Sequence, residues 1–299
     1  MSSAGLLPEP RRQPPPRSPA ASSVVGESPF ARAVIMTVAL AFLALFLVLP
    51  LVVIFAEAFS KGAEAFLATF SDSDAVAAIA TTFLVTAIAV PANIVFGIAA
   101  AWAVAKFQFP LKSVLLTLID LPFSVSPVVA GLTFIILFGA QSTLGPMLEA
   151  HGITIIFALP GLVIVTIFVS VPFVARELIP LMQQQGTAEE EAALILGASG
   201  FTIFRRVTLP NIKWGLFYGV LLCNARAMGE FGAVSVVSGK IRGETATMPL
   251  QIDIYYNEYA SVAAFSIAVL LALSALLTLA LKAALEWRFA DELAAGRRH

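Results

Sequence analysis

Long apolar stretches separated by short polar connections make up most of the sequence. A helix needs about 20 apolar residues to cross the hydrocarbon core of a bilayer. Six stretches reach that length, so the pattern predicts an all-α membrane protein with six transmembrane helices. The predicted spans cover residues 33–56, 76–105, 113–139, 153–180, 213–237 and 261–285.

Prolines fall inside several of the predicted spans. Pro91 lies in the second span, and Pro160 and Pro172 lie in the fourth. Both spans are longer than a bilayer requires, so we expect these helices to tilt or kink at their prolines. The third span contains Pro122 and Pro127. We expect a break there that lies against protein or a cavity, because lipid cannot satisfy the freed carbonyl groups.

The two ends of the chain differ from its apolar body. Residues 1–30 are rich in Pro, Arg and Ser and cannot build a core, so they are expected to form a disordered cytoplasmic tail. The apolar run that follows is too long for the core of a signal peptide and is interpreted as a retained first span. We therefore predict one six-span domain over 31–288, with its core at about 76–285, and a cytoplasmic C-terminal tail over 289–299.

Composition supports the membrane class. The chain is 59% hydrophobic and 12% charged, with a mean hydropathy of +0.91, whereas soluble domains are about 25% charged. A net charge of −1 with dispersed basic residues gives no indication of a nucleic-acid or acidic ligand, and no nucleic-acid partner is expected. The single cysteine, Cys223, excludes an intrachain disulfide and a cysteine-rich metal site.

Lys and Arg residues in the short connections indicate the orientation, because cytoplasmic loops carry the excess of positive charge. Fourteen of them fall on one side of the predicted spans and three on the other, which leaves Arg226 inside a span. Both termini are therefore predicted to be cytoplasmic. The cytoplasmic set is Arg11, Arg12, Arg17, Arg32, Lys106, Lys112, Arg176, Arg205, Arg206, Lys213, Lys282, Arg288, Arg297 and Arg298, and the opposite set is Lys61, Lys240 and Arg242.

The longest polar-flanked segment, residues 187–210, has the pattern of two short helices joined by a hinge. Thr187 and Glu190 have the spacing of a capping box, and acidic residues fill the first turn, where the helix dipole favours them. Gly197 is placed to end the first helix, and Ser199 is placed to cap the second. The segment is predicted to stand outside the membrane on the cytoplasmic side.

The same segment resembles the signature of importer permeases of the ATP-binding cassette (ABC) superfamily. That signature is Glu-Ala-Ala, three residues, Gly, nine residues, an aliphatic residue, one residue and Leu-Pro, and every position fits here. The resemblance implies a type I ABC importer permease (MetI-like) fold, in which these residues couple the subunit to a separate ATPase. Pro210 is expected to close the segment. The matching positions are Glu191, Ala192, Ala193, Gly197, Val207, Leu209 and Pro210.

Three ionisable residues, Asp120, Arg226 and Glu230, stand out within the predicted spans, where charge is costly and usually functional. Arg226 and Glu230 are four positions apart, so on a helix they share a face and can pair. Asp120 is expected nearer the membrane surface, which makes it the less favoured partner of Arg226. Such a pair can serve as a structural link within the helix bundle or as a contact for a passing ligand.

Further motifs lie in residues 120–131, 173–182, 224–239, 241–244 and 255–259. Together they resemble the permeases of sulfate and thiosulfate importers over residues 33–288. A looser form of the run around Arg226 occurs in molybdate permeases. The resemblance implies a heteromeric complex in the bacterial cytoplasmic (inner) membrane. Its other members would be a paralogous sulfate permease, two copies of a cytoplasmic ATPase that bind ATP and Mg, and a periplasmic sulfate/thiosulfate-binding protein.

The sequence contains no catalytic constellation. It has no glycine-rich phosphate loop ending in Gly-Lys-Ser/Thr, so ATP is expected on another chain and no cofactor on this one. The two histidines, His151 and His299, are not placed as paired metal ligands. An intramembrane enzyme is disfavoured by the histidine-free spans, and an ATP-independent channel or secondary transporter has no use for the Glu-Ala-Ala segment. The choice among sulfate, thiosulfate and molybdate stays open, as does homodimer formation.

Overall fold

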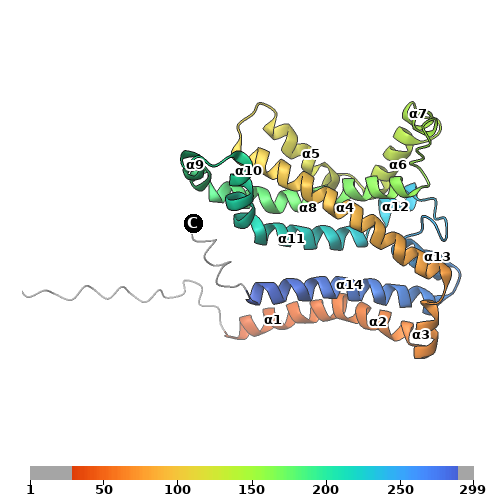
Figure 1. Cartoon of the computed structure of the whole chain (residues 1–299). Coiled ribbons are helices and arrows are strands. Elements are labelled where there is room, and N and C mark those ends of the chain that lie inside the picture. The colour runs from red at the N-terminus through yellow and green to blue at the C-terminus, as the bar shows by residue number, and fades with distance from the viewer. Residues whose placement is uncertain (1–28, 289–299) are drawn as a thin grey trace, which may run out of the picture. The chain divides into compact units, whose positions relative to one another are not determined.

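The structure is a computed structural model that describes residues 29–288, and every regular element in that range is helical (Figure 1). The tails predicted for 1–30 and 289–299 lie outside the described residues, except that the first helix already begins at Pro29. The all-α expectation is therefore confirmed for the part of the chain that the structure describes.

The first of two units in the chain ends at Leu51 and holds most of one apolar helix, Phe30–Ala58. Within it, the N–H of Leu49 donates to the carbonyl of Ala44, five residues back instead of four. Pro50 has no N–H, and its ring would collide with the carbonyl four residues back, so the widened turn accommodates it. The helix consists of α1 (Pro29–Leu43), the π-helical turn η1 (Ala44–Val48) and α2 (Leu49–Ala58).

The second unit, from Val52 onward, is built on the long helices α4, α8, α11 and α14, with shorter helices at both of their ends (Figure 1). Its elements are α3 (Ala63–Thr69), α4 (Ser73–Lys106), α5 (Lys112–Ser124), α6 (Pro127–Phe138), α7 (Leu144–Glu149), α8 (Leu159–Gln185), α9 (Ala188–Ile195), α10 (Gly200–Ile203), the π-helical turn η2 (Phe204–Thr208), α11 (Leu209–Met228), α12 (Gly232–Val237), α13 (Met248–Asn257) and α14 (Ser261–Arg288).

Four helices in residues 29–288 are long and apolar enough to cross a membrane: Phe30–Ala58, α4, α8 and α14. Helices α5 and α6 meet the same criteria together, as one span bent by 110°. The 20 residues of α11 are sufficient in length, but polar side chains such as Lys213 and Arg226 lower its hydropathy. These five spans and α11 occupy the places of the six predicted spans, and the chain is a multi-pass membrane protein.

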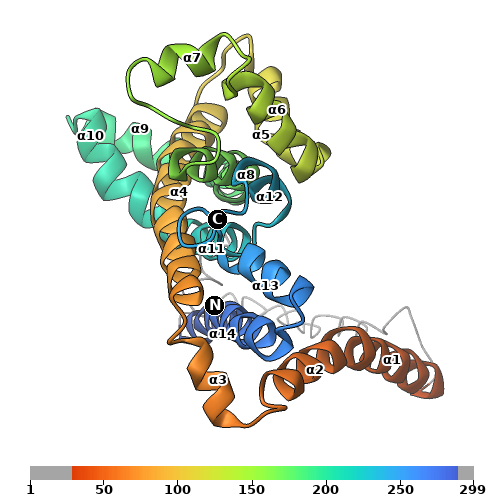
Figure 2. The same cartoon turned by 90° about the vertical axis from the view of Figure 1, so that its right-hand side faces the viewer.

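The centre of the bundle forms where α4, α8 and α11 pack side by side (Figure 2). Val174 of α8 is fully buried between Gly97 of α4 and Gly219 of α11. A Cβ atom on Gly97 would lie 2.6 Å from Val174 Cγ1, and a Cβ atom on Gly219 would lie 3.2 Å from Val174 Cα. Both distances are shorter than ordinary van der Waals contact, so the two glycines allow the helices to approach this closely.

The fourth span starts later than the sequence predicts, at Leu159 instead of residue 153. Pro160 lies in the first turn of α8, so it begins the helix and does not kink it, contrary to the prediction. The physical reason is that proline has no N–H, and the first turn of a helix leaves its N–H groups without intrahelical partners. Pro172 does lie inside α8, as Pro91 lies inside α4.

The third span breaks between α5 and α6, with Pro127 in the first turn of α6. The break lies against α12. A Cβ atom on Gly232 of α12 would come within 2.9 Å of Pro127 Cβ, and one on Gly131 would come within 2.8 Å of the Ala233 carbonyl oxygen. The expectation that a break there lies against protein is confirmed by these contacts.

The prediction of one continuous helix over 213–237 is wrong. Helix α11 ends at Met228, and three non-helical residues, Gly229, Glu230 and Phe231, lead into α12. The Glu230 carboxylate accepts the N–H of Ala233 at 2.8 Å, which satisfies a donor at the start of the new helix. Glu230 therefore lies beyond α11 instead of on its face.

Candidate coupling segment and ion pairs

The segment predicted to couple the subunit to an ATPase forms α9, α10 and η2, which project from one end of the bundle (Figure 1). Gly197 follows α9 with a φ of +83°, in the left-handed region. Its N–H donates to the Leu194 carbonyl at 2.9 Å, and the N–H of Ala198 donates to the Ala193 carbonyl at 3.1 Å. These bonds form a Schellman motif, which satisfies the last carbonyls of the helix. Ser199 then caps α10 through its side chain, as predicted.

The coupling segment joins α11 without an interruption. As in η1, one turn is widened, and the N–H of Leu209 donates to the Phe204 carbonyl. Pro210 accordingly lies in the first turn of α11 and does not close the segment, contrary to the prediction. Val207 and Leu209 are half-buried at this joint, and Pro210 is exposed.

The capping box predicted for Thr187 and Glu190 is not formed. The Thr187 hydroxyl donates to the Glu191 carboxylate at 2.6 Å instead. The Glu190 carboxylate lies 2.9 Å from Lys106 Nζ and accepts the Thr208 hydroxyl at 2.8 Å. The contact with Lys106 joins two opposite charges, whereas a capping bond to a backbone N–H has a charge on the carboxylate only, so Glu190 pairs with the lysine. In the sequence, Lys106 is distinguished only by its positive charge at the end of a span.

An exposed apolar surface, the apolar knob, covers the outer side of α9 and α10. Its members are Leu194, Ile195, Leu196 and Phe201, which are 63%, 86%, 87% and 73% exposed. Next to it, Glu191 and Ala192 are exposed and Ala193 is half-buried. Large apolar side chains gathered at this exposure mark a surface for contact with another protein or with the membrane.

Arg226 and Glu230 pair, as their spacing predicts, but the geometry differs from that of two residues on one helix. Arg226 lies in the last turn of α11, and Glu230 lies just beyond it. Glu230 is buried, whereas the Arg226 side chain is 30% exposed. Because Glu230 also accepts the N–H of Ala233, the pair links the end of α11 to the start of α12. A role in assembly or in translocation stays a prediction.

Asp120 pairs with Arg176 of α8 and not with Arg226. Arg176 Nε lies 2.8 Å from Asp120 Oδ1, and its guanidinium stands 5.0 Å from the centroid of the Phe123 ring. Both charged side chains are about half exposed, so the pair lies at the surface of this chain. The charge of Arg176 inside the apolar pattern of the fourth span is the sequence signal that could have identified it.

The contact between α8 and α11 also has a sequence signal that the prediction missed. Gly215 and Gly219 have the GxxxG spacing, which lets two helices approach closely. A Cβ atom on Gly215 would lie 2.5 Å from Leu181 Cδ2, and Gly219 lies against Val174. The motif identifies the packed face of α11, although it does not say which helix packs there.

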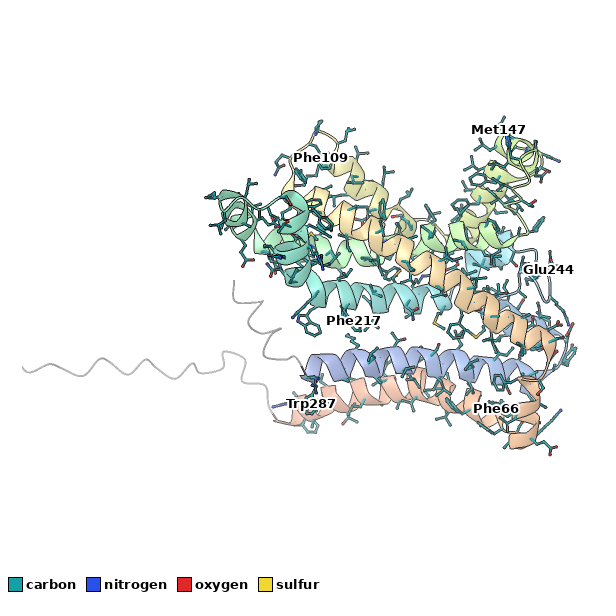
Figure 3. All side chains as sticks on the ribbon, viewed as in Figure 1. Phe66, Phe109, Met147, Phe217, Glu244 and Trp287 are labelled. Atoms are coloured by element: carbon teal, nitrogen blue, oxygen red, sulfur yellow. The ribbon has the colours of Figure 1, made fainter. Side chains whose placement is uncertain are left out.

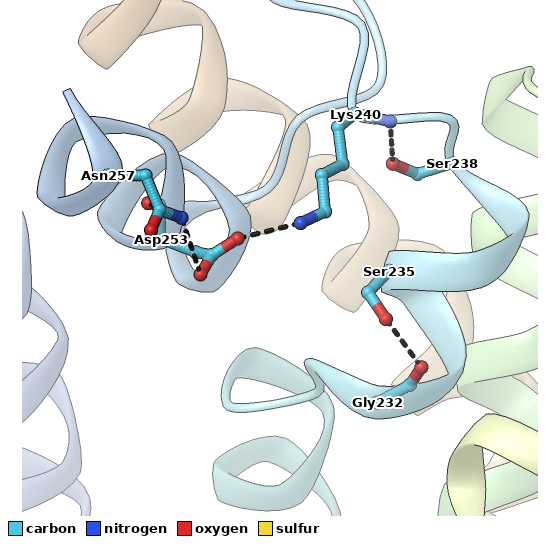
Figure 4. A network of polar contacts seen from close by, with 6 residues as sticks. All are labelled: Gly232, Ser235, Ser238, Lys240, Asp253 and Asn257. Carbon is cyan, nitrogen blue, oxygen red and sulfur yellow. Dashed lines mark hydrogen bonds and ion pairs between the residues drawn. The ribbon is translucent and has the colours of Figure 1, made fainter.

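At the opposite end of the bundle, polar residues join α12, α13 and the loop between them (Figure 4). Lys240 Nζ lies 2.7 Å from Asp253 Oδ2, and the Lys240 N–H donates to the Ser238 hydroxyl at 2.9 Å. These contacts hold Lys240 at a φ of +55°, which is uncommon for a residue with a side chain. Arg242 pairs with Glu258. Two of the basic residues predicted for the outer side are thus each paired with an acid.

Tyr255 ties α13 to the start of α4. Its hydroxyl donates to the carboxylate of Asp72, the residue that caps α4. Burial raises the pKa of Tyr255 to about 12, and the Asp72 carboxylate adds to the shift because it repels a phenolate.

Comparison with known proteins finds relatives over most of the chain. Residues 93–291 match the family model described as binding-protein-dependent transport system inner membrane component. The chain is 54% identical over 249 residues to the sulfate transport system permease protein CysW of Escherichia coli K12, covering 83% of this chain and 86% of the relative. It is 36% identical over 239 residues to the sulfate transport system permease protein CysT of Salmonella typhimurium, covering 80% and 86%.

The fold also matches a solved transporter. The similar chain comes from the crystal structure of a bacterial alginate ABC transporter in complex with an alginate pentasaccharide-bound periplasmic protein. The TM-score is 0.73, and the match covers 87% of this chain and 95% of that chain. The two sequences are 15% identical, so this likeness establishes the shared permease fold alone.

Proposed function

The chain belongs to the binding-protein-dependent transport system inner membrane components and, among them, to the sulfate transport permeases of the CysW type. From this membership we propose that it is the transmembrane permease subunit of an ATP-driven importer of sulfate and thiosulfate. The observation that carries the proposal is the identity shared with the Escherichia coli CysW protein along most of both chains. Identity at that level extends far beyond the Glu-Ala-Ala signature, which does not distinguish one transported substrate from another.

The anion pathway is assigned to the contact between this subunit and a paralogous permease of the CysT type. Sulfate transport permeases of both names align with most of this chain, which supports a pair of related subunits. Transport then proceeds by alternating access, in which the two helix bundles rock against each other and open the pathway to one side at a time. A pathway must bind its ion weakly enough to release it. High affinity is therefore assigned to a periplasmic sulfate/thiosulfate-binding protein that delivers the anion.

The supply of energy for transport is assigned to two copies of a cytoplasmic ATPase, which bind ATP and Mg. This chain itself performs no chemistry. The support is the apolar knob, whose exposed side chains suit a groove on a second protein. The neighbouring Glu191 offers an exposed carboxylate to a basic residue of the ATPase, and Ala192 lets the two surfaces approach closely. Closure of the ATPase dimer would pull on α9 and α10 and, through the continuous helix from η2, on α11.

The location assigned to the complex is the bacterial cytoplasmic (inner) membrane, with both termini of this chain in the cytoplasm. The support is the excess of Lys and Arg on the side of the coupling segment, including Arg205 and Arg206 of η2. The binding protein would then meet the opposite end of the bundle, where α13 and the loop before it lie.

Uptake of radiolabelled sulfate tests the proposal. A bacterial strain that lacks its own sulfate permeases receives this chain together with its partner subunits, and uptake is competed with thiosulfate and with molybdate. Sulfate uptake that thiosulfate suppresses and molybdate does not is the expected result. Uptake of molybdate alone would assign the subunit to a different oxyanion, and uptake that persists without ATP would exclude the ABC mechanism.

A further inference from the structure

One lysine of α4 holds the base of the coupling segment. Lys106, the last residue of α4, places its Nζ 2.9 Å from Glu190 Oε2 and also donates to the carbonyl of Gly186, just after α8. Glu190 accepts in addition the hydroxyl of Thr208, the last residue of η2. The elements α4, α9 and η2 and the end of α8 therefore meet at this ion pair.

The pair is shielded from water, which distinguishes it from a surface contact. The side chains of Lys106 and Glu190 are 7% and 17% exposed, and Thr208 is 2% exposed. Surface ion pairs contribute little, because water and salt screen them. In a shielded pair, by contrast, separating the partners leaves each charge buried without compensation, which is costly. The two side chains are therefore held in one geometry.

We propose that Lys106 and Glu190 are positioning residues that lock the coupling segment to α4, so that a displacement of the segment by the ATPase also moves α4. The inference rests on the proposed function, since it requires an ATPase that acts on the segment. Along the chain, the segment is connected only to α8 and α11. The ion pair adds a third long helix, α4, to which the backbone does not connect it.

A second contact from the same face of α4 supports the lock. Trp102 lies four residues before Lys106, so the two side chains share one side of the helix. The Trp102 ring lies 5.8 Å, centroid to centroid, from the Phe204 ring of η2. One face of α4 thus holds α9 through an ion pair and η2 through an aromatic contact.

The contacts near the other end of α4 show which elements a movement of this helix would displace. With 34 residues, α4 spans about 50 Å at 1.5 Å per residue. Near its start, the Thr82 hydroxyl accepts the N–H of Met248, the first residue of α13, at 2.8 Å. The Thr81 hydroxyl donates to the carbonyl of Glu244 at 3.4 Å, and Figure 3 shows Glu244 at the end of the bundle opposite to Phe109, which follows α4. As one uninterrupted helix, α4 therefore connects the coupling segment with α13.

The test uses the whole complex, with its ATPase, paralogous permease and binding protein, in proteoliposomes. Two variants break the pair, Lys106→Met and Glu190→Gln. Lys106→Arg keeps the charge and donors, and Lys112→Met removes a lysine at the same end of the bundle, where its Nζ lies 3.5 Å from the Phe107 carbonyl. Three quantities are measured for each: the amount of ATPase that copurifies, ATP hydrolysis stimulated by the loaded binding protein, and anion imported per ATP.

Both pair-breaking variants should keep the ATPase, because the apolar knob is unchanged, and should lose about fivefold or more of the anion imported per ATP. The double variant should be no worse than either single variant, since both remove one interaction. Lys106→Arg and Lys112→Met should behave like the unchanged protein. A merely structural role would lower the amount of complex but leave the ratio of anion to ATP intact.

Two results would overturn the inference: an unchanged ratio in both variants, or loss of the ATPase from them during purification. Failure of the proposed function has a different signature. If the complex without substitutions is stimulated by molybdate and not by sulfate, the substrate assignment is wrong, and the ratio of imported anion to ATP is then measured with molybdate. If the subunit without substitutions never binds an ATPase, the proposed function and the inference are both refuted.

Discussion

Arg226 and Glu230 are joined by an ion pair that crosses the end of a helix, since only Arg226 belongs to α11. Glu230 is 3% exposed, and its other carboxylate oxygen accepts the N–H of Ala233 at 2.8 Å. One carboxylate therefore neutralises a partly buried guanidinium and also accepts an N–H from the first turn of α12. The two functions can be separated by substitution.

Arg226→Ala should destabilise the subunit more than Glu230→Gln, because it leaves a buried carboxylate without its counter-charge. The cost is expected near the lower end of about 3–5 kcal/mol, since the Arg226 side chain is 30% exposed. Glu230→Gln removes the charge but keeps an oxygen for the Ala233 N–H. The amount of assembled complex in membranes and the rate of sulfate uptake are the two measurements.

These measurements also decide between the two roles predicted for the pair. If Arg226→Ala and Glu230→Ala assemble normally but do not transport, the pair contacts the anion or moves with the pathway. If assembly and uptake are both normal, the pair has neither role.

Gly197→Ala should weaken the hold of the subunit on its ATPase, and Gly200→Ala should not. Gly197 has a φ of +83°, where a residue with a side chain is strained by about 1–2 kcal/mol. Gly200 begins α10 and has open space around it, so an alanine fits there. Copurified ATPase and sulfate uptake are compared for the two variants. Equal retention of the ATPase and normal uptake in both would contradict the coupling role of the Gly197 turn.

Gly97→Ala should destabilise the bundle, whereas Gly215→Ala should be tolerated. The added methyl group at Gly97 would meet Val174 Cβ at 2.7 Å, and a Cβ of a β-branched residue on a packed helix cannot move aside. At Gly215 the nearest atom is Cδ2 of Leu181, the end of a flexible side chain. We expect a cost of about 1–3 kcal/mol for Gly97→Ala. Thermal unfolding in detergent compares the two, and similar midpoints would show that the contact with Val174 is not limiting.

Single cysteines should establish the orientation. In a background with Cys223 replaced, a cysteine at Thr143 is expected to react with a membrane-impermeant reagent in intact cells, and a cysteine at Ala188 is expected to react only after the cells are opened. Both positions are exposed, so accessibility does not differ within the subunit. The reverse pattern would invert the predicted topology.

The stability of the α4–α13 contact should fall at alkaline pH. The pKa of Tyr255 is raised from 10.0 to about 12, so the folded protein holds the phenol proton more tightly than the unfolded chain does. The contribution is complete below pH 10.0 and is lost as the pH rises to about 12. Tyr255→Phe should remove this part of the pH dependence. A phenolate absorbance titration in which all four tyrosines ionise near their ordinary value would contradict the shift.

The sequence alone determined the features that depend on neighbouring residues. Hydropathy along the chain located the spans, because a bilayer requires long apolar stretches whatever the tertiary packing. The spacing around Gly197 located the turn of the coupling segment, because a Schellman motif involves only residues close in the chain. The prolines of the third span indicated its break for the same reason.

Only the tertiary structure decided which distant residues meet. Asp120 pairs with Arg176, 56 positions away. Glu190 pairs with Lys106 of another helix and does not form the local capping box with Thr187. The end of α11 at Met228 depends on α12 turning to pack against α6. Such choices follow from which helix faces lie together, as where Gly97 and Gly219 enclose Val174. A buried charge takes the strongest partner that packing brings within reach, and no rule of local spacing contains that information.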